Sequence, residues 1–226
     1  MNCQAVLPET SGPAGMPLVE TLRVLHENRG PNDIVITTMG TAREWTDFEQ
    51  HPLDLVYTPS SMGQATSVAL GLAMAQPDRN VVVCQGDGSL LMNLGSLVTI
   101  TARMPDNLVV LLMENRVYEI TGRQGTPGTA DLRAGGQNID YVALARAAGF
   151  PEVQVFDNLA TWRRAAATVL NSTGPVFAVL KVQPVSGDTA PKSPGPAWQR
   201  ATALRNHLTD GSDGTVSGPS PTHSPQ

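Results

Sequence analysis

Apolar positions along the chain fall into two recurring patterns. Short runs rich in Val, Ile and Leu predict buried strands, and residues 108–113 (LVVLLM) are apolar throughout, which is typical of a strand covered on both faces. Segments with apolar residues three and four apart predict helices, the first marked by Leu18, Leu22 and Leu25 and ended by Gly30-Pro31. The predicted strands are 34–38, 55–58, 81–84, 108–113, 153–156 and 176–182. The other predicted helices are 41–50, 63–76, 90–102, 140–148 and 159–170.

This alternation of strand and helix predicts an α/β fold with three layers: an open, mostly parallel sheet with helices on both faces. We expect one domain over residues 17–183, preceded by a flexible leader at 1–16. Residues 184–226 are rich in Pro, Ser and Gly, which is typical of disorder. Within them, an amphipathic segment at 197–208 predicts one short helix.

Composition argues against several classes of function. The 20 acidic and 15 basic residues give a net charge of -5, and only 4% of residues are aromatic, so we expect no nucleic-acid partner. No apolar run reaches the roughly 18 residues of a membrane span, and no signal peptide is predicted. The two cysteines, Cys3 and Cys84, lie far apart and form no disulfide framework, which favours a cytoplasmic location.

A carboxylate lies between two glycines where a predicted strand meets a predicted helix. The stretch is Gly86-Asp87-Gly88-Ser89, at the carboxyl end of strand 81–84, where open parallel sheets bind ligands. The glycines allow a close approach of the backbone, and the N–H groups at the start of the helix suit a phosphate. Asp87 would repel that phosphate unless a divalent cation such as Mg²⁺ or Ca²⁺ lies between them. Alternatively, Asp87 only caps the helix.

The next predicted strand, 108–113, supplies a second candidate ligand. It leads into Glu114-Asn115, and Asn115 offers a neutral side-chain oxygen. The 25 residues between Gly88 and Glu114 are enough for one helix and one strand, which would bring the two strand ends side by side.

These residues resemble the motif of a known family. A GDG followed by about 25 residues and then a pair ending in Asn is similar to the thiamine-diphosphate-binding motif of 2-oxo acid decarboxylases. The resemblance covers roughly residues 18–183 and includes DIVITTMGTAREWTDF, SSMGQATSVALGLAMAQPDRNVVVCQGDGSLLMNLGSLVTI and ENRVYEITGRQGTPG. These stretches resemble the diphosphate-binding half of phosphonopyruvate and sulfopyruvate decarboxylases.

The resemblance implies thiamine diphosphate and Mg²⁺ as cofactors. Asp87, Asn115 and the backbone carbonyl of Val117 would be the metal ligands. Met62 would hold the cofactor in its bent form, and the carbonyl of Ser60 would accept a hydrogen bond from its aminopyrimidine; for Met62 ordinary core packing is the alternative. The other residues implied to contact the cofactor are Gly40, Thr41, Ala42, Ser61, Gly63, Gly86, Gly88, Ser89 and Tyr118.

Two positions depart from the family pattern. Glu114 stands where Asn or Asp is usual, so we do not count it as a ligand. Glu119 follows Tyr118 where Gly is common, and it should face the substrate. Polar side chains are also expected near the mouth of the site, although each is more often a surface residue: Arg43, Gln64, Arg116 and Arg123.

The family further requires a Glu that contacts the cofactor's pyrimidine from a different domain. The matching sequence holds only the diphosphate and metal half, so the resemblance implies a separate pyrimidine-binding, α-type subunit and an α/β heteromer such as a heterotetramer or a larger assembly. The implied activity is decarboxylation of a small 2-oxo acid to an aldehyde. A carboligase or acyl-transfer subunit and a catalytically silent, cofactor-binding partner are the alternatives.

Overall fold

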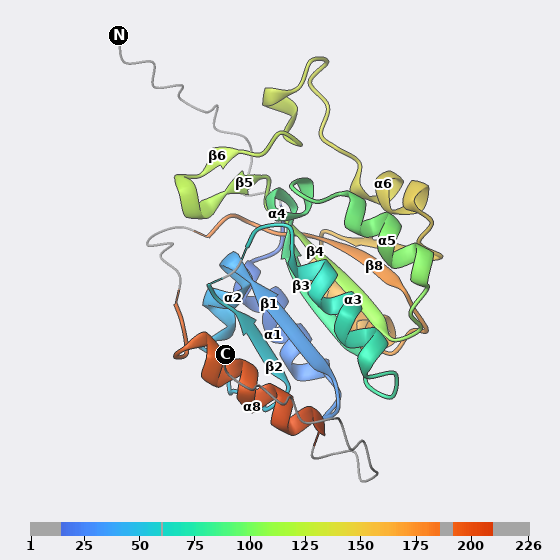
Figure 1. Ribbon diagram of the computed structural model, residues 1–226. Coiled ribbons are helices and arrows are strands. Elements are labelled where there is room, and N and C mark those ends of the chain that lie inside the picture. Colours follow the sequence, from blue (N-terminus) through green and yellow to red (C-terminus); the bar gives the residue numbers. More distant parts are fainter. Residues whose placement is uncertain (1–14, 60, 186–191, 210–226) are drawn as a thin grey trace, which may run out of the picture.

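A six-stranded parallel sheet forms the centre of the molecule. The computed structural model describes residues 15–59, 61–185 and 192–209. The sheet has the order β2-β1-β3-β4-β8-β7, and every pairing within it is parallel (Figure 1). Its strands are β1 (Ile34–Thr38), β2 (Asp54–Tyr57), β3 (Val81–Gly86), β4 (Leu108–Glu114), β7 (Glu152–Phe156) and β8 (Val176–Lys181). The α/β three-layer fold predicted from the sequence is confirmed.

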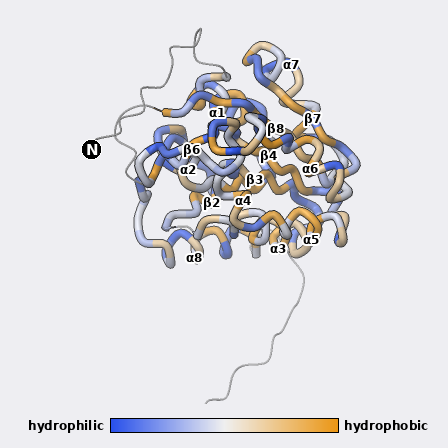
Figure 2. Tube along the Cα trace, turned by 90° about the horizontal axis from the view of Figure 1, so that it is seen from above, coloured by the Kyte–Doolittle hydropathy of each residue, from blue (hydrophilic) through white to orange (hydrophobic). Residues whose placement is uncertain are grey.

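Helices cover both faces of this sheet. Their bounds are α1 (Leu18–Asn28), α2 (Met39–Trp45), α3 (Ala65–Ala75), α4 (Asp87–Leu91), α5 (Gly95–Arg103), α6 (Tyr141–Ala148), α7 (Leu159–Leu170) and α8 (Ala197–Thr209). One core cluster lies under α1, α2 and α7, and the other under α3, α4, α5, α6 and α8. Figure 2, which views the molecule from above, shows the apolar strands between these two helical layers.

The central strand β4 shows why the sheet is apolar throughout. Side chains alternate between the two faces of a strand, so Val109, Leu111 and Met113 join one core cluster. Leu108, Val110 and Leu112 join the other. Since both faces are covered by helices, every residue of β4 is buried, as its continuous apolar run predicts.

The connections of the sheet create a crevice between β1 and β3. The chain leaves β1 through α2 toward β2 at one edge, whereas it leaves β3 through α4 and α5 toward β4 in the opposite direction. The two loops therefore diverge at the carboxyl ends of neighbouring strands, where open α/β sheets bind ligands.

Three segments differ from the sequence prediction. The helix predicted over 90–102 is two helices separated by a turn at 92–94, and the helix predicted over 41–50 ends at Trp45. A short hairpin, β5 (Val117–Tyr118) with β6 (Gln124–Gly125), follows β4 and was not predicted. It lies beside α4 at one end of the sheet (Figure 1). Two 3-10 turns, η1 (Glu119–Thr121) and η2 (Ala130–Leu132), follow the two hairpin strands.

The predicted leader boundary is wrong at its last residue. Met16 is buried, and it forms a parallel bridge with Val182 after β8. Residues 1–14 lie outside the described residues, as do 186–191 and 210–226. Within the predicted tail, α8 is present where a helix was expected over 197–208. No helix among the described residues has the length and apolar character needed to cross a membrane.

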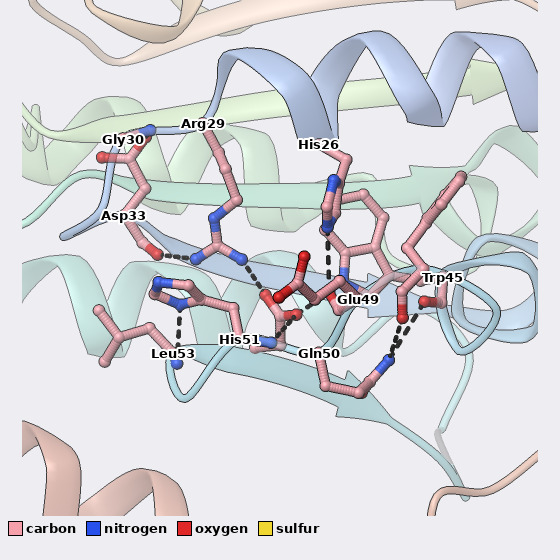
Figure 3. A network of polar contacts seen from close by, with 11 residues as sticks. His26, Arg29, Gly30, Asp33, Trp45, Glu49, Gln50, His51 and Leu53 are labelled. Carbon is pink, nitrogen blue, oxygen red and sulfur yellow. Dashed lines mark hydrogen bonds and ion pairs between the residues drawn. The ribbon is translucent and has the colours of Figure 1, made fainter.

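A buried polar network joins the end of α1 to the edge strand β2 (Figure 3). The Arg29 guanidinium pairs with the carboxylate of Asp54 and donates to the carbonyl of Asp33. Asp54 also accepts from the Trp45 indole at 3.0 Å and from the backbone N–H of His51 at 3.1 Å. These contacts fix β2 and the loop before it against α1 and α2, at the end of the sheet opposite the crevice.

Candidate functional site

A cavity lies at the carboxyl ends of β1, β3 and β4. Its wall comes from the loops after these strands, from the β5 segment, and from the residues that begin α1 and follow β8. The lining residues are Leu18, Thr38, Met39, Gly40, Thr41, Met62, Gly86, Asp87, Gly88, Ser89, Met113, Asn115, Val117, Tyr118, Glu119, Ile120, Thr121 and Val182.

Asp87 is one of two acidic residues in this wall, the other being Glu119. Asp87 is 1% exposed, and its Oδ2 accepts the backbone N–H of Arg116 at 3.1 Å. Oδ1 is buried without a hydrogen-bond partner. Burial raises the pKa of Asp87 to about 6, against the lowering effect of the nearby backbone N–H groups of Gly88, Arg116 and Asn115, of which only that of Arg116 makes a hydrogen bond to the carboxylate. A buried carboxylate oxygen without a donor is costly, so this atom is a natural ligand for a cation.

The loop after β4 brings a second oxygen to the same corner. Gly86 pairs with Met113, so Asp87 and Asn115 leave adjacent strand ends. Asn115 Oδ1 accepts the backbone N–H of Val117 at 3.1 Å, which orients the side chain within the wall. Arg116, between them, has a φ of 65°, an uncommon value for a residue with a side chain that concentrates at functional sites.

This donor set fits a hard divalent cation. One carboxylate, one amide oxygen and backbone carbonyls are the ligands that Mg²⁺ and Ca²⁺ prefer. No group of three or more His, Cys, Asp or Glu side chains that could hold a metal is found among the described residues. Glu114 is not part of this set, because its carboxylate pairs with Arg116 at 3.1 Å.

Two glycines bring backbone close to the cavity. A Cβ on Gly88 would lie 2.4 Å from the ring of Tyr118, so only glycine permits this ring to pack on α4. A Cβ on Gly40 would lie 2.9 Å from the carboxylate of Glu119. The Thr41 hydroxyl donates to the Thr38 carbonyl at 2.7 Å and accepts the Thr38 N–H at 3.0 Å, so it closes the turn after β1.

The turn that carries Met62 is held by α4 and by the turn that follows this helix. The Ser89 hydroxyl accepts the N–H of Gly63 at 2.9 Å, and the Asn93 side chain donates to the Gly63 carbonyl at 2.9 Å. Gly63 has a φ of 84°, and Met62 lines the cavity beside it. Asn93 was missed by sequence reasoning, because its partner lies 30 residues away and nothing in the local pattern marks it.

The structure brings most of the predicted residues to one wall and leaves some aside. Ala42 is buried in the core, and neither its side chain nor Ser61 or Gly63 lines the cavity. Ser60 lies outside the described residues. The binding roles assigned to all these residues stay predictions.

The residues expected at the mouth are placed differently. None of Arg43, Gln64, Arg116 or Arg123 lines this cavity. Arg43 is instead buried at 3% exposure of its side chain, against the expectation of a surface position. Glu119, expected on the substrate side, does line the cavity, but it is also buried.

Comparisons with known proteins find relatives for most of this chain. The profile of a family described as thiamine pyrophosphate enzyme, C-terminal TPP binding domain, matches residues 34–180. The chain is 41% identical over 158 residues to the sulfopyruvate decarboxylase subunit beta of Methanothermobacter thermautotrophicus, covering 70% of this chain and 77% of that protein.

Some of the other relatives are much longer than the matched region. A phosphonopyruvate decarboxylase of Streptomyces viridochromogenes is 38% identical over 169 residues, which span 74% of this chain but only 39% of that enzyme. Among solved structures, the thiamine diphosphate-dependent 4-hydroxybenzoylformate decarboxylase of Rhodococcus jostii RHA1 superposes with a TM-score of 0.59 at 16% identity. It covers 78% of this chain and 34% of that one, and it supports the fold alone.

Proposed function

Since this chain belongs to the thiamine pyrophosphate enzymes, through their C-terminal TPP-binding domain, we propose that it is the diphosphate- and metal-binding subunit of a heteromeric 2-oxo acid decarboxylase. The observation that carries the proposal is the buried Oδ1 of Asp87, which has no hydrogen-bond partner and belongs to a cavity wall that also contains Asn115. A Mg²⁺ ion bound there would neutralise the carboxylate and attract a diphosphate to the same corner.

Each part of the wall has a separate task in this proposal. Asp87, Asn115 and the carbonyl of Val117 would hold Mg²⁺. The backbone around Gly40 and Gly88 would bind the diphosphate, since the absence of side chains lets a ligand approach closely. When bound, thiamine diphosphate would take up the electron pair released as CO₂ leaves the 2-oxo acid. Met62, fixed by the turn at Gly63, would set the shape of the cavity beside the reacting end.

The substrate and partner are proposed from the relatives. The matched proteins are named for sulfopyruvate and phosphonopyruvate, so we expect a small 2-oxo acid with a second anionic group and an aldehyde product. Three relatives are named as beta subunits of sulfopyruvate decarboxylase. We therefore expect a pyrimidine-binding partner that supplies the activating Glu, in an α/β heterotetramer or a larger assembly.

The metal site is tested by calorimetric titration of the full chain with inorganic pyrophosphate and Mg²⁺. We expect Asp87→Ala to abolish Mg²⁺-dependent binding while the circular dichroism spectrum stays unchanged, because the variant removes a buried charge rather than an apolar contact. Asp157→Ala is the matched control, since this carboxylate also follows a strand of the sheet but is exposed. Unchanged affinity in Asp87→Ala would remove Asp87 from the site.

The activity is tested with the chain alone and with its co-purified partner. We expect CO₂ and aldehyde from sulfopyruvate or phosphonopyruvate only when both subunits and thiamine diphosphate are present. Turnover by the rigorously purified single chain would contradict the divided site. A complex that binds the cofactor but releases no CO₂ would favour the silent partner, and a carbon–carbon coupled product would favour the carboligase.

A further inference from the structure

A buried cation, Arg43, lies behind the cavity wall beside a buried carboxylate of that wall, Glu119. Arg43 lies in α2 and Glu119 in η1, 76 residues later, and their side chains are only 3% and 4% exposed. Arg43 Nη2 lies 3.9 Å from Glu119 Oε2, and Arg43 Nε donates to Glu44 at 2.6 Å. Neither Nη atom of Arg43 has a hydrogen-bond partner within the described part of the chain.

Glu119 places a negative charge beside the turn proposed to bind the diphosphate. It lines the cavity, and its Oε2 occupies the space that the missing side chain of Gly40 leaves open. Its Oε1 accepts the backbone N–H of Val185 at 2.7 Å, which holds the carboxylate in place. Two like charges a few ångströms apart repel strongly in a medium of low polarity, so an uncompensated carboxylate here would oppose binding of an anion.

Arg43 supplies the opposing charge. Burying a guanidinium whose N–H groups lack acceptors is unfavourable for folding. Glu119, at 3.9 Å, does not satisfy all of these donors. Arg43 does not line the cavity, whereas Glu119 does. Arg43 therefore influences the cavity by offsetting the charge of Glu119. We propose that Arg43 is a positioning residue which offsets the charge of Glu119 and thereby allows the Gly40 turn to accept a diphosphate. This inference rests on the proposed function.

The charged cluster consists of Arg43, Glu44 and Glu119. Its net charge predicts the order of pyrophosphate affinity among four proteins. The wild type carries one net negative charge in this cluster, and so does the double variant Arg43→Gln with Glu119→Gln, because Glu44 remains in both. Arg43→Gln leaves two negative charges, and Glu119→Gln leaves none. Calorimetric titration with inorganic pyrophosphate and Mg²⁺ should therefore find the weakest binding in Arg43→Gln, at least about tenfold below wild type. Glu119→Gln should bind more tightly than wild type, and the double variant should return close to it.

The pattern separates charge compensation from a merely structural role. If Arg43 only stabilised the fold, the double variant would bind no better than Arg43→Gln, and that result would overturn the inference. Arg163→Gln is the matched control, because it removes one positive charge from an ion pair about half exposed and outside the cavity wall. If Arg43→Gln does not fold, Glu119→Gln decides: weaker binding than wild type rejects the inference. Failure of the wild type itself to bind pyrophosphate would instead reject the proposed function.

Discussion

At the scale of single residues, Asp87 holds the least favourable position for an isolated metal-free chain. Its carboxylate is buried, one of its oxygens has no donor, and Glu114 adds a nearby negative charge. The backbone N–H of Arg116 relieves only part of this cost. Under the proposed function, a bound cation would remove this cost, so the metal-free protein would give up stability for binding.

The metal-free stability should depend on pH through Asp87. Because burial raises its pKa from 3.8 to about 6, the folded chain binds the proton more tightly than the unfolded chain. This stabilising contribution is complete below about pH 4 and is lost as pH rises through about 6. We expect Asp87→Asn to raise the free energy of unfolding by about 1–3 kcal/mol at neutral pH and hardly at all near pH 4. Urea unfolding in EDTA at both pH values measures this.

Asp157→Asn provides the comparison, since that residue is exposed and should leave stability unchanged at either pH. If the free energy of unfolding of Asp87→Asn rises equally at the two pH values, titration of the Asp87 carboxyl is not the cause of the rise.

At the scale of elements, the packing of the β5 segment on α4 depends on a single missing side chain. The ring of Tyr118 lies against Gly88, and Thr126 lies 3.2 Å from where a Cβ would be. Gly86, two residues earlier, has open space around its Cβ position. The two glycines of the GDG therefore differ in their structural requirement, although the sequence presents them alike.

Substitution by alanine should separate these two glycines. We expect Gly88→Ala to displace Tyr118 and lower the free energy of unfolding by about 1–3 kcal/mol, because the contact is far inside van der Waals distance. Gly86→Ala should change stability by less than about 0.5 kcal/mol. Denaturant unfolding measures the difference, and Tyr fluorescence reports displacement of the ring. Equal effects of the two substitutions would contradict this account of the packing.

The elements also show how far sequence reasoning reaches. Strands such as 34–38 and 108–113 were predicted within one residue, because burial on both faces gives continuous apolar runs. The break between α4 and α5 could not be predicted, since the apolar pattern runs through it and the turn depends on Asn93 binding a residue 30 positions earlier. The two-residue strands of β5 and β6 are too short to show any periodicity. Burial of Arg43 escaped prediction because it depends on Glu119, which is remote in sequence.

At the scale of the whole molecule, α8 protects an exposed edge of the sheet. β2 is an edge strand, and such strands offer unpaired backbone groups to other chains. Arg200 of α8 donates to the carbonyls of Val56 and Thr58, and Leu204 is buried in the core cluster beneath the helix. The helix thereby binds backbone carbonyls at the β2 edge and also covers apolar surface of the sheet.

Removing the Arg200 side chain should loosen this cover. We expect Arg200→Ala to lower the free energy of unfolding by about 1–3 kcal/mol, because two carbonyls lose a charged donor, and to make α8 sensitive to limited proteolysis. Arg205→Ala, on the exposed side of the same helix, should leave both properties unchanged. If α8 resists limited proteolysis in Arg200→Ala as well as it does in the wild type, then Leu204 alone holds this helix on the sheet.

The residues just before α1 and just after β8 also determine how this unit can join others. Met16 donates its N–H to the carbonyl of Lys181 at 2.8 Å, and Gln183 donates to Met16 at 2.9 Å, so the path into the α/β unit runs beside the path out of it. A unit with neighbouring entry and exit points can be fused into a longer polypeptide or made as a separate one without rearrangement of its interior. The matched region spans 77% of a relative named as a beta subunit but only 39% of a phosphonopyruvate decarboxylase, so similar units occur in polypeptides of different length, as the neighbouring entry and exit points allow.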